Sequence, residues 1–347
     1  MAIVEVPRSI VGGVDTHLDV HVAAAVDSVG GLLAVRSFPT TPAGHHALLS
    51  WLGSFGVIDR VGVEGTGTYG AGLARHLAAA GLNVVEVDRP NRQERRRNGK
   101  SDELDAIEAA RAALSGRARG QAKGGTGNVE ALRALLVAKR SARSIRIRTT
   151  GQLRHLVITA PDDLRERLEG LTTTRLIAEA AVLRPRAGND PVRHATKTAI
   201  VTLARRVQTI NAEISVLDRH LETLVRATAP QLLEIYGVGV DTAAILLVAA
   251  GDNVSRIRSE AAWAHLCGVA PIPAGSGKTN KRRRLNPGGN RQANHALWRI
   301  VLTRLGQGES RTAAYMRRRL AEGRTKPEII RSLKRYVARE IYHQLFA

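Results

Sequence analysis

The stretch RVGVEGTGTYGAGLARHL, residues 60–77, decides the fold. An apolar run ends at Glu64, and three glycines with the spacing G-x-G-x-x-G then lead into an alanine-rich helical pattern. A dinucleotide-binding loop has this spacing, and acidic Glu86 follows about 20 residues on, as such a site requires. The glycines equally permit a tight strand-to-helix turn, in which case Glu64, at the end of the strand, is the functional residue.

The order of the elements around this stretch argues against a dinucleotide fold. Three β-rich runs precede the first helical pattern, so the order is β-β-β-α-β-α-β-α. A dinucleotide domain alternates strand and helix from its start and places the glycine loop after its first strand, whereas here the loop follows the fourth. We expect an α/β domain whose sheet begins with antiparallel hairpins and continues through right-handed crossovers. The expected strands cover residues 9–15, 20–27, 31–39, 59–64 and 82–88, and the expected helices cover 41–56, 70–81 and a segment from 101.

Four acidic residues stand at the ends of these elements. Asp15 ends the first strand, Glu64 ends the fourth, and Asp102 and Asp105 lie three apart at a helix start, so that they share one face. Because neighbouring central strands end close to one another, we expect these acids to converge at one sheet edge. Four hard oxygen donors suit one or two Mg²⁺ ions, which align an attacking oxygen and stabilise a leaving one during phosphodiester cleavage.

Each acid also has an ordinary explanation. A helix macrodipole favours acids in the first turn, and an acid at a strand end can be a rim residue or a turn former. All four at these positions of one α/β domain are harder to explain in that way. His17 and His21, which flank Asp15, are expected to be rim or sheet residues rather than ligands.

The charge of the chain indicates a polyanionic partner. Its 347 residues contain 52 Lys and Arg against 31 Asp and Glu, a formal net charge of +21. Such a field attracts nucleic-acid phosphates, and the alternative is a merely basic soluble protein. Aromatic residues make up 3% of the chain, which argues against recognition by rows of base-stacking rings.

Composition also narrows the class of protein. Hydrophobic residues make up 44% of the chain, enough for a buried core, and Cys267 is the single cysteine. A disulfide framework within the chain and a cysteine-rich zinc site are therefore excluded, and the apolar run around Cys267 predicts a buried thiol. Because no stretch reaches the roughly 18 uninterrupted apolar residues of a membrane span, we expect a soluble intracellular protein without membrane contact.

Beyond the α/β region the sequence becomes helical. Residues 116–130 are rich in glycine and are expected to form a linker. Long helical patterns follow over 131–158 and 196–227, with a shorter helical region between them. This arrangement indicates an antiparallel hairpin or a coiled-coil arm. Basic arms of this kind hold nucleic acid or another subunit, and the pattern does not separate the two.

Residues 232–252, LLEIYGVGVDTAAILLVAAGD, have the pattern of a helix-hairpin-helix. In that motif the backbone amides of the turn, near Gly237 and Gly239, contact a phosphate at the N-terminus of the next helix. An ordinary helical corner has the same pattern. A loop dense in glycine and arginine follows, and residues 325–346 form a last helical pattern with a basic face.

The glycine- and arginine-dense loop contains a serine between two glycines, Ser276. Such a serine is ordinarily part of a flexible loop, and its hydroxyl needs a metal or a base to become nucleophilic. The cations that follow it either neutralise phosphate charge or belong to a solvated basic loop. These cations are Lys278, Arg282, Arg283 and Arg284.

Four strings together resemble the DEDD-type insertion-sequence transposases, also described as bridge-RNA-guided recombinases. They are GVDTHLDVHVAAAVD, VGVEGTGTYG, KSDELDA and GVAPIPAGSGKTNKRRRLNPGGNRQANHALW, and the resemblance spans nearly the whole chain. It implies three domains: a RuvC-like (RNase H-like) α/β catalytic domain at 1–118, an all-α coiled-coil linker domain at 119–228, and a mainly α-helical transposase domain at 229–347. The last domain would contain the helix-hairpin-helix and the serine loop.

The resemblance also implies roles for particular residues and partners. The four acids match the family's metal-binding set, which implies Mg²⁺, and Ser276 matches the serine proposed to attack DNA and form a phosphoserine link. Many relatives have two serines there, whereas this chain has Gly275 before Ser276. The implied partners are donor and target DNA, a noncoding guide RNA, and further copies of the chain as dimers that assemble to a tetramer. The implied location is the bacterial cytoplasm, at the nucleoid.

The acids and Ser276 fall in different expected domains, so they would meet after domain closure or between protomers. The leading hypothesis is therefore an RNA-guided transposase or recombinase. A second is a Mg²⁺-dependent nuclease resembling Holliday-junction resolvases, in which water is the nucleophile and Ser276 is inert. A third is a non-catalytic RNA- or DNA-binding protein with a degenerate sheet domain, and a nicotinamide enzyme ranks last.

Overall fold

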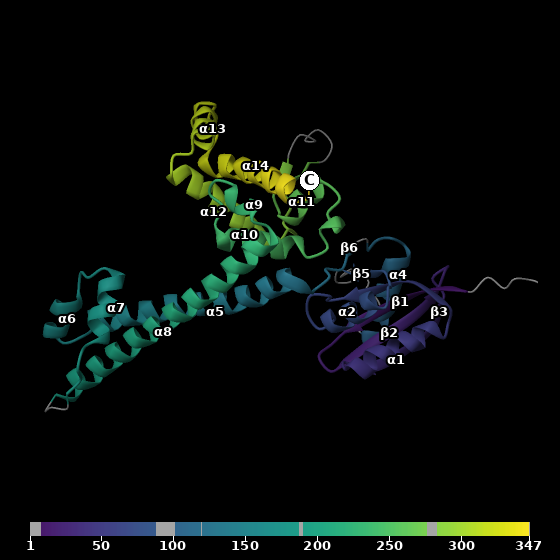
Figure 1. Cartoon of the computed structure of the whole chain (residues 1–347), viewed down its shortest axis with the longest axis horizontal. Coiled ribbons are helices and arrows are strands. Elements are labelled where there is room, and N and C mark those ends of the chain that lie inside the picture. Colours follow the sequence, from purple (N-terminus) through teal and green to yellow (C-terminus); the bar gives the residue numbers. More distant parts are fainter. Residues whose placement is uncertain (1–7, 88–100, 119, 187–189, 276–282, 347) are drawn as a thin grey trace, which may run out of the picture. The chain divides into compact units, whose positions relative to one another are not determined.

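The computed structural model describes residues 8–87, 101–118, 120–186, 190–275 and 283–346. The chain forms two compact units. Unit 1 consists of Met1–Gly127 together with Ala250–Arg258, and unit 2 consists of Asn128–Ala249 together with Ser259–Ala347. Figure 1 shows the elements of both units along the chain. The three domain boundaries expected above remain a prediction.

Unit 1 is built on a six-stranded mixed sheet with the strand order β3-β2-β1-β4-β5-β6. β2 pairs antiparallel with both β1 and β3, and β4 pairs parallel with both β1 and β5. The predicted order of three strands before the first helix is confirmed, with antiparallel hairpins first and parallel strands after them. The strands are β1 (Ser9–Thr16), β2 (Val20–Asp27), β3 (Leu32–Pro39), β4 (Val57–Glu64), β5 (Val84–Val87) and β6 (Gly120–Gln121).

The segment expected to be a linker, residues 116–130, contains regular structure. β6 pairs antiparallel with β5 at the sheet edge, and helix α5 begins at Gly127. β6 has two residues, and so short a strand leaves no alternating pattern in the sequence.

Helices cover both faces of this sheet (Figure 1). α1 (Pro42–Gly53) and α2 (Ala71–Ala79) pack against the face that carries Ile10, Val14 and Val63. α4 (Asp102–Leu114) packs against the other face, where Val11 and Val26 meet its alanines. Successive residues of a strand point to opposite faces, so each central strand is buried on both sides.

A short segment from late in the chain completes unit 1. It includes the one-turn helix η1 (Val254–Arg256). Asn253 Nδ2 donates a hydrogen bond to the Ala122 carbonyl oxygen at 2.7 Å, and the Thr126 amide donates to Asp252 Oδ2 at 2.7 Å. These bonds hold the chain that follows β6 against residues 250–258, a contact that the sequence did not predict.

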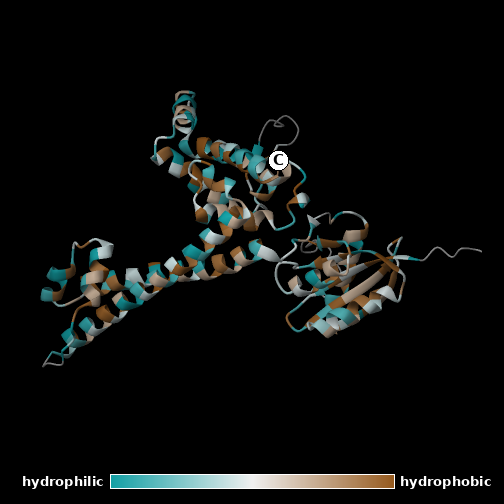
Figure 2. Cartoon of the chain, in the orientation of Figure 1, coloured by the Kyte–Doolittle hydropathy of each residue, from teal (hydrophilic) through white to brown (hydrophobic). Residues whose placement is uncertain are grey.

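Unit 2 begins with two long antiparallel helices, α5 (Gly127–Ile158) and α8 (Pro191–Thr228). Arg146 on α5 donates a hydrogen bond to Asn211 on α8, and Ala142 packs against Ile210 and Ile214. The predicted antiparallel helical pair is confirmed, and its description as a coiled coil remains a prediction. In Figure 2 hydrophobic and hydrophilic residues alternate along both helices, as expected when one side of each is buried. The connection contains α6 (Asp162–Leu168) and α7 (Thr173–Ala181).

The rest of unit 2 is mainly helical, as predicted. A two-stranded antiparallel hairpin, β7 (Pro271–Pro273) with β8 (Arg283–Leu285), interrupts it. Cys267 and Trp263 are fully buried, in agreement with the predicted buried thiol. Within the described residues no helix combines the length and apolar character needed to cross a membrane. The helices are α9 (Gln231–Glu234), α10 (Val240–Ala250), α11 (Glu260–Leu266), α12 (Arg291–Gly306), α13 (Ser310–Ala321) and α14 (Lys326–Phe346).

Candidate active site

The predicted acids lie where β1, β4 and α4 meet. β1 and β4 run parallel with Val14 opposite Val63, so Asp15 and Glu64, the next residues of the two strands, are neighbours at the edge of the sheet. The Thr16 hydroxyl donates a hydrogen bond to the Glu64 carbonyl oxygen at 2.8 Å and ties the two strand ends together. Two of the four acids therefore come together through the parallel ladder alone.

Two glycines allow α4 to approach this edge closely. Gly13 and Gly62 each stand two residues before an acid and so point to the same face of the sheet as that acid. A Cβ atom at Gly13 would overlap backbone atoms of Ala106 and Ala110, and one at Gly62 would lie 2.6 Å from the Ala109 carbonyl oxygen. The sequences G-V-D and G-V-E thus form a flat stripe on which α4 lies.

α4 brings its first-turn acids to the same edge. The Ser101 hydroxyl caps the helix by accepting a hydrogen bond from the Leu104 amide. Asp105, one turn in, is buried, whereas about half of the Asp102 side chain (49%) is exposed. Both carboxylates lie close enough to Asp15 that their charges raise its pKa. The predicted convergence of Asp102 and Asp105 on the β1 terminus is therefore present in the fold.

Asp15 is the buried centre of the group. Burial is the largest influence and raises the pKa of its carboxyl group, because desolvation penalises the charged form. The neighbouring His17 opposes this rise, both by its charge and by its hydrogen bond, without cancelling it. A buried carboxylate with two acidic neighbours is a place where added positive charge is favourable.

His17 contacts two of these acids and joins the group. Its Nε2 atom lies 2.9 Å from Asp15 Oδ2 and 3.4 Å from Asp102 Oδ1. The interpretation of His17 as a rim residue missed this contact, although the sequence D-T-H places the ring just past the strand end on the side of Asp15. His21, by contrast, is a fully buried sheet residue on β2, as predicted.

The donor atoms of this group fit a divalent cation. One ligand atom each of Asp15, His17 and Asp102 lies within 4.8 Å of the other two. Glu64 lies beside this set, because it neighbours Asp15 on the adjacent strand. Asp105 also lies close to it, since its charge raises the pKa of Asp15. Carboxylate oxygens are the ligands that Mg²⁺ prefers, and a single imidazole is tolerated better by Mn²⁺. The site therefore has the chemistry of a divalent-metal site with hard ligands.

The predicted nucleic-acid residues of the C-terminal loop are only partly described. Ser276, Lys278 and Arg282 lie outside the described residues. Arg283 and Arg284 lie on β8, the strand that follows the Ser276 segment, and both are exposed. Their roles remain predictions.

The glycine turn before α10 is described in full. Gly237 has a φ of +82°, which favours glycine, and packs against Arg304 and Ile300. The Gly239 amide donates to Thr242 Oγ1 at 3.0 Å, so this amide already has a partner within the turn. The helix before the turn, α9, has four residues. Phosphate binding at Gly237 and Gly239, and the helix-hairpin-helix itself, remain predictions.

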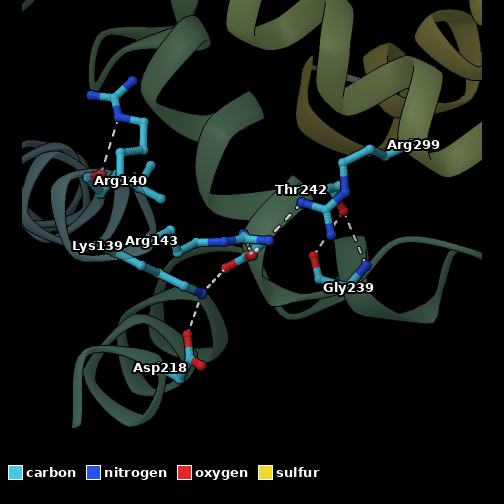
Figure 3. Close-up of polar contacts among 9 residues, drawn as sticks. Lys139, Arg140, Arg143, Asp218, Gly239, Thr242 and Arg299 are labelled. Carbon is cyan, nitrogen blue, oxygen red and sulfur yellow. Dashed lines mark hydrogen bonds and ion pairs between the residues drawn. The ribbon is translucent and has the colours of Figure 1, made fainter. Parts of the chain in front are cut away.

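A second cluster of charges lies within unit 2 and is centred on Asp241, in the first turn of α10. Figure 3 labels its members Lys139, Arg143, Asp218 and Arg299. The buried Lys139 of α5 pairs with Asp241 and with Asp218 of α8. Arg143 lies 3.1 Å and Arg299 of α12 lies 3.7 Å from Asp241 Oδ2. One carboxylate thus joins the long helices to α10 and α12. We interpret this cluster as structural, because its charges satisfy one another.

Unit 1 is consistent with an RNase H-like domain: a mixed sheet whose second strand is antiparallel, with acids at the ends of β1 and β4 and on the helix that crosses them. Comparisons with known proteins agree with this class. Residues 12–160 match a family model for DEDD transposases of the IS110 type, described as "Transposase". Residues 229–317 match a second, described as "Transposase IS116/IS110/IS902 family".

The chain belongs to the IS110 family of DEDD transposases. It is 30% identical over 138 residues to a Streptomyces coelicolor protein named "Insertion element IS110 uncharacterized 43.6 kDa protein". That alignment covers 39% of this chain and 34% of the relative, so the chain spans about a third of the curated relative it matches. The first matched region contains all four predicted acids, and the second contains Ser276.

Proposed function

We propose that the chain is a metal-dependent DNA transposase or recombinase that cuts and rejoins DNA for an insertion sequence. The observation that carries this proposal is the convergence of Asp15, Asp102 and Asp105 with Glu64 at one edge of an RNase H-like sheet. The match of this region to DEDD transposases supports it.

The acids hold one or two divalent ions, which we propose to be Mg²⁺. When bound, such an ion polarises the scissile phosphate and stabilises negative charge on the oxygens that attack and leave. Burial raises the pKa of the Asp15 carboxyl group, and a bound cation would favour its charged form. Exposed Asp102 is the ligand that can move to accommodate the DNA, and buried Asp105 lies behind Asp15.

Ser276 is the proposed nucleophile, in keeping with the resemblance of its loop to the family's C-terminal motif. Its Oγ atom forms a bond to the phosphorus of a DNA phosphodiester as the bond to one sugar oxygen breaks. The serine proton leaves and the released sugar oxygen becomes a hydroxyl, so the number of phosphoester bonds does not change. Attack by a second DNA hydroxyl on the phosphoserine restores Ser276 and joins the strands without an external energy source.

The distribution of charge supports separate roles for the two units. Unit 1 carries 16 Lys and Arg against 14 Asp and Glu, whereas unit 2 carries 36 against 17. Residues 259–347 alone carry 18 against 5. We propose that unit 2 binds donor and target DNA and a noncoding guide RNA, and that dimers assemble to a tetramer in the bacterial cytoplasm.

Capture of a covalent intermediate tests this proposal. The full chain, co-expressed with the flanking sequence of its element, is incubated with element DNA and Mg²⁺ and then denatured. We expect a protein–DNA adduct that maps to Ser276 by peptide mass spectrometry and is absent in Ser276→Ala. Ser144→Ala, a change at an exposed helical serine, is the matched control and retains the adduct. Attachment at another residue contradicts the mechanism.

A metal-dependent nuclease that uses water is the second candidate. The acid site supports it, because Asp15, His17 and Asp102 bring metal ligand atoms together in unit 1, and a metal ion can activate a bound water as the nucleophile. Strand cutting that persists in Ser276→Ala, with no adduct in the unmodified chain, would favour this candidate. Loss of cutting in Ser276→Ala would exclude it.

A further inference from the structure

Aromatic rings gather in one cavity of unit 2. The chain has five tyrosines, and three of them, Tyr236, Tyr315 and Tyr336, line a cavity of about 780 Å³. They come from the turn before α10, from α13 and from α14. Because aromatic residues form only 3% of the chain, this gathering is a specific feature of the cavity rather than a consequence of composition.

The tyrosine rings leave part of their surface accessible to a planar group of a ligand. Tyr315 and Tyr336 meet edge to face, with ring centroids 5.4 Å apart and planes at 76°. The Arg318 guanidinium carbon lies 5.3 Å from the Tyr315 ring centroid. Tyr236 and Tyr336 are 49% and 47% exposed. A buried core pair of tyrosines would not leave this much ring surface accessible.

A second cavity, of about 680 Å³, adjoins the first, since Tyr315 and Tyr336 line both. Half of its other lining residues are arginines, which come from β8 and α14. Glu328 is the one acid among them, and its carboxylate accepts hydrogen bonds from the Thr325 amide and hydroxyl. The arginines of this second cavity are Arg283, Arg284, Arg331, Arg335 and Arg339.

Several of these arginines are available to an external anion. Arg335 and Arg339 pair with Glu260 of α11. Within the residues that the structure describes, Arg283, Arg284 and Arg331 form no ion pair with a carboxylate. The two cavities therefore place exposed guanidinium groups beside exposed tyrosine rings, with the Glu328 carboxylate near Arg331. Guanidinium groups bind phosphate oxygens, and tyrosine faces stack with nucleobases.

We propose that these adjoining cavities hold an unpaired nucleotide of the DNA strand that the chain cuts. Its base stacks on Tyr315 or Tyr336, and its phosphates contact Arg283, Arg284 and Arg331. Stacked bases of an intact duplex do not expose a face to such rings, so the occupant is an unpaired nucleotide. Arg283 follows Ser276 by seven residues along the chain, which favours the cut strand as the source. The proposal rests on the proposed function.

A fluorescent base tests it directly. 2-Aminopurine is placed as an unpaired base between two DNA duplex arms and titrated with the full chain in Ca²⁺, so that binding is read without cutting. We expect quenching on binding, with Tyr315→Ala and Tyr336→Ala each reducing the quenching and weakening binding about tenfold, in line with stacking on one aromatic ring. The corresponding Phe variants retain the ring and should retain both signals.

Matched controls separate stacking from folding and from catalysis. Tyr342→Ala removes an α14 tyrosine that lines neither cavity and should leave quenching unchanged. A continuous duplex should bind all variants equally. Ser276→Ala and Asp102→Asn should still quench, so a failure of the proposed chemistry is distinguishable from a failure of this site. Unchanged quenching in both Ala variants overturns the proposal, as does stronger quenching by the same probe in RNA.

Discussion

The two units differ in what their charges do. In unit 1, basic and acidic residues are almost balanced, and the acids of β1, β4 and α4 are gathered at one point. In unit 2, basic residues outnumber acidic ones about two to one, and the central acid, Asp241, is surrounded by cations. A carboxylate site repels DNA phosphates, so binding energy for the polyanion has to come from elsewhere. Under the proposed function, unit 2 supplies this energy and unit 1 supplies the metal site.

The largest effect that tests this difference between the units is expected on removal of Asp15, the central acid of unit 1. In Asp15→Asn we expect strand cutting to fall at least about 100-fold, because an electrostatic element of the transition state is lost, while DNA affinity stays the same. Cutting is measured by gel assay and affinity by fluorescence anisotropy. Asp19→Asn, at an exposed position four residues on, should behave like the unmodified chain. A parallel loss of DNA affinity would contradict the separation of roles.

The glycine stripe under α4 provides a test of the stability of unit 1. Gly13→Ala would place a methyl group against the backbone of Ala106 and Ala110, and we expect unit 1 to lose about 3 kcal/mol or more of unfolding free energy. Chemical denaturation followed by fluorescence of Trp51, the tryptophan of unit 1, measures this. Gly53→Ala, in α1 with nothing within 4 Å of the added methyl, should be neutral or slightly stabilising. Equal effects of the two changes would refute the argument.

In unit 2 the corresponding weak point is the Asp241 cluster. Asp241→Asn leaves buried Lys139 with Asp218 as its remaining partner and removes the charge that faces Arg143 and Arg299. We expect a loss of about 3 kcal/mol, since breaking a buried ion pair strands a charge. Glu222→Gln breaks an exposed pair with Arg226 and should cost less than about 1 kcal/mol. Thermal unfolding followed by circular dichroism compares them, and a loss confined to unit 1 would be inconsistent with this role.

The smallest expected effect is a dependence of unit 1 on pH. Burial first, and then the charges of His45 and His17, lower the pKa of His21 from 6.5 to about 4. His45 of α1 lies stacked on His21, and His76 of α2 lies beyond His45. In the unfolded chain His21 is protonated below about pH 6.5. In the folded chain it is protonated only below about pH 4. Stability is highest above pH 6.5 and falls as the pH is lowered between these values, by about 2 kcal/mol from pH 7 to pH 5.

Denaturation at pH 7 and pH 5, read through Trp51, measures this fall. His21→Phe should remove most of it, because phenylalanine does not titrate. His220→Phe, at an exposed position of α8 in unit 2, should retain it. A fall of equal size in His21→Phe would show that other groups are responsible.

The fold of unit 1 was predictable because its strands leave alternating or continuous apolar patterns that end in acids. Asp15 and Glu64 could be placed together from strand order alone. The role of Gly13 and Gly62 could not, since a glycine's significance depends on which helix backbone approaches it. The contact of His17 with Asp15 and Asp102 was not predicted for a related reason, since it depends on where α4 lies.

In unit 2 the long helices and their antiparallel pairing followed from spacing of three and four, whereas the tyrosine cavity did not. Tyr236, Tyr315 and Tyr336 are spread over about a hundred residues of sequence, and only the packing of α13 and α9 against α14 brings them to one place. Low aromatic content argues against rows of rings along the chain, yet it says nothing about where a few rings gather.

The insertion of residues 250–258 into unit 1 has a consequence for synthesis of the chain. The Ala122 carbonyl and the Gly124 and Thr126 amides find their partners in Asp252 and Asn253. During translation these groups cannot form these hydrogen bonds until the ribosome has added more than a hundred further residues. Unit 1 is thus fully assembled only after the long helices of unit 2 exist, and a polypeptide that ends before residue 250 lacks the last piece of unit 1.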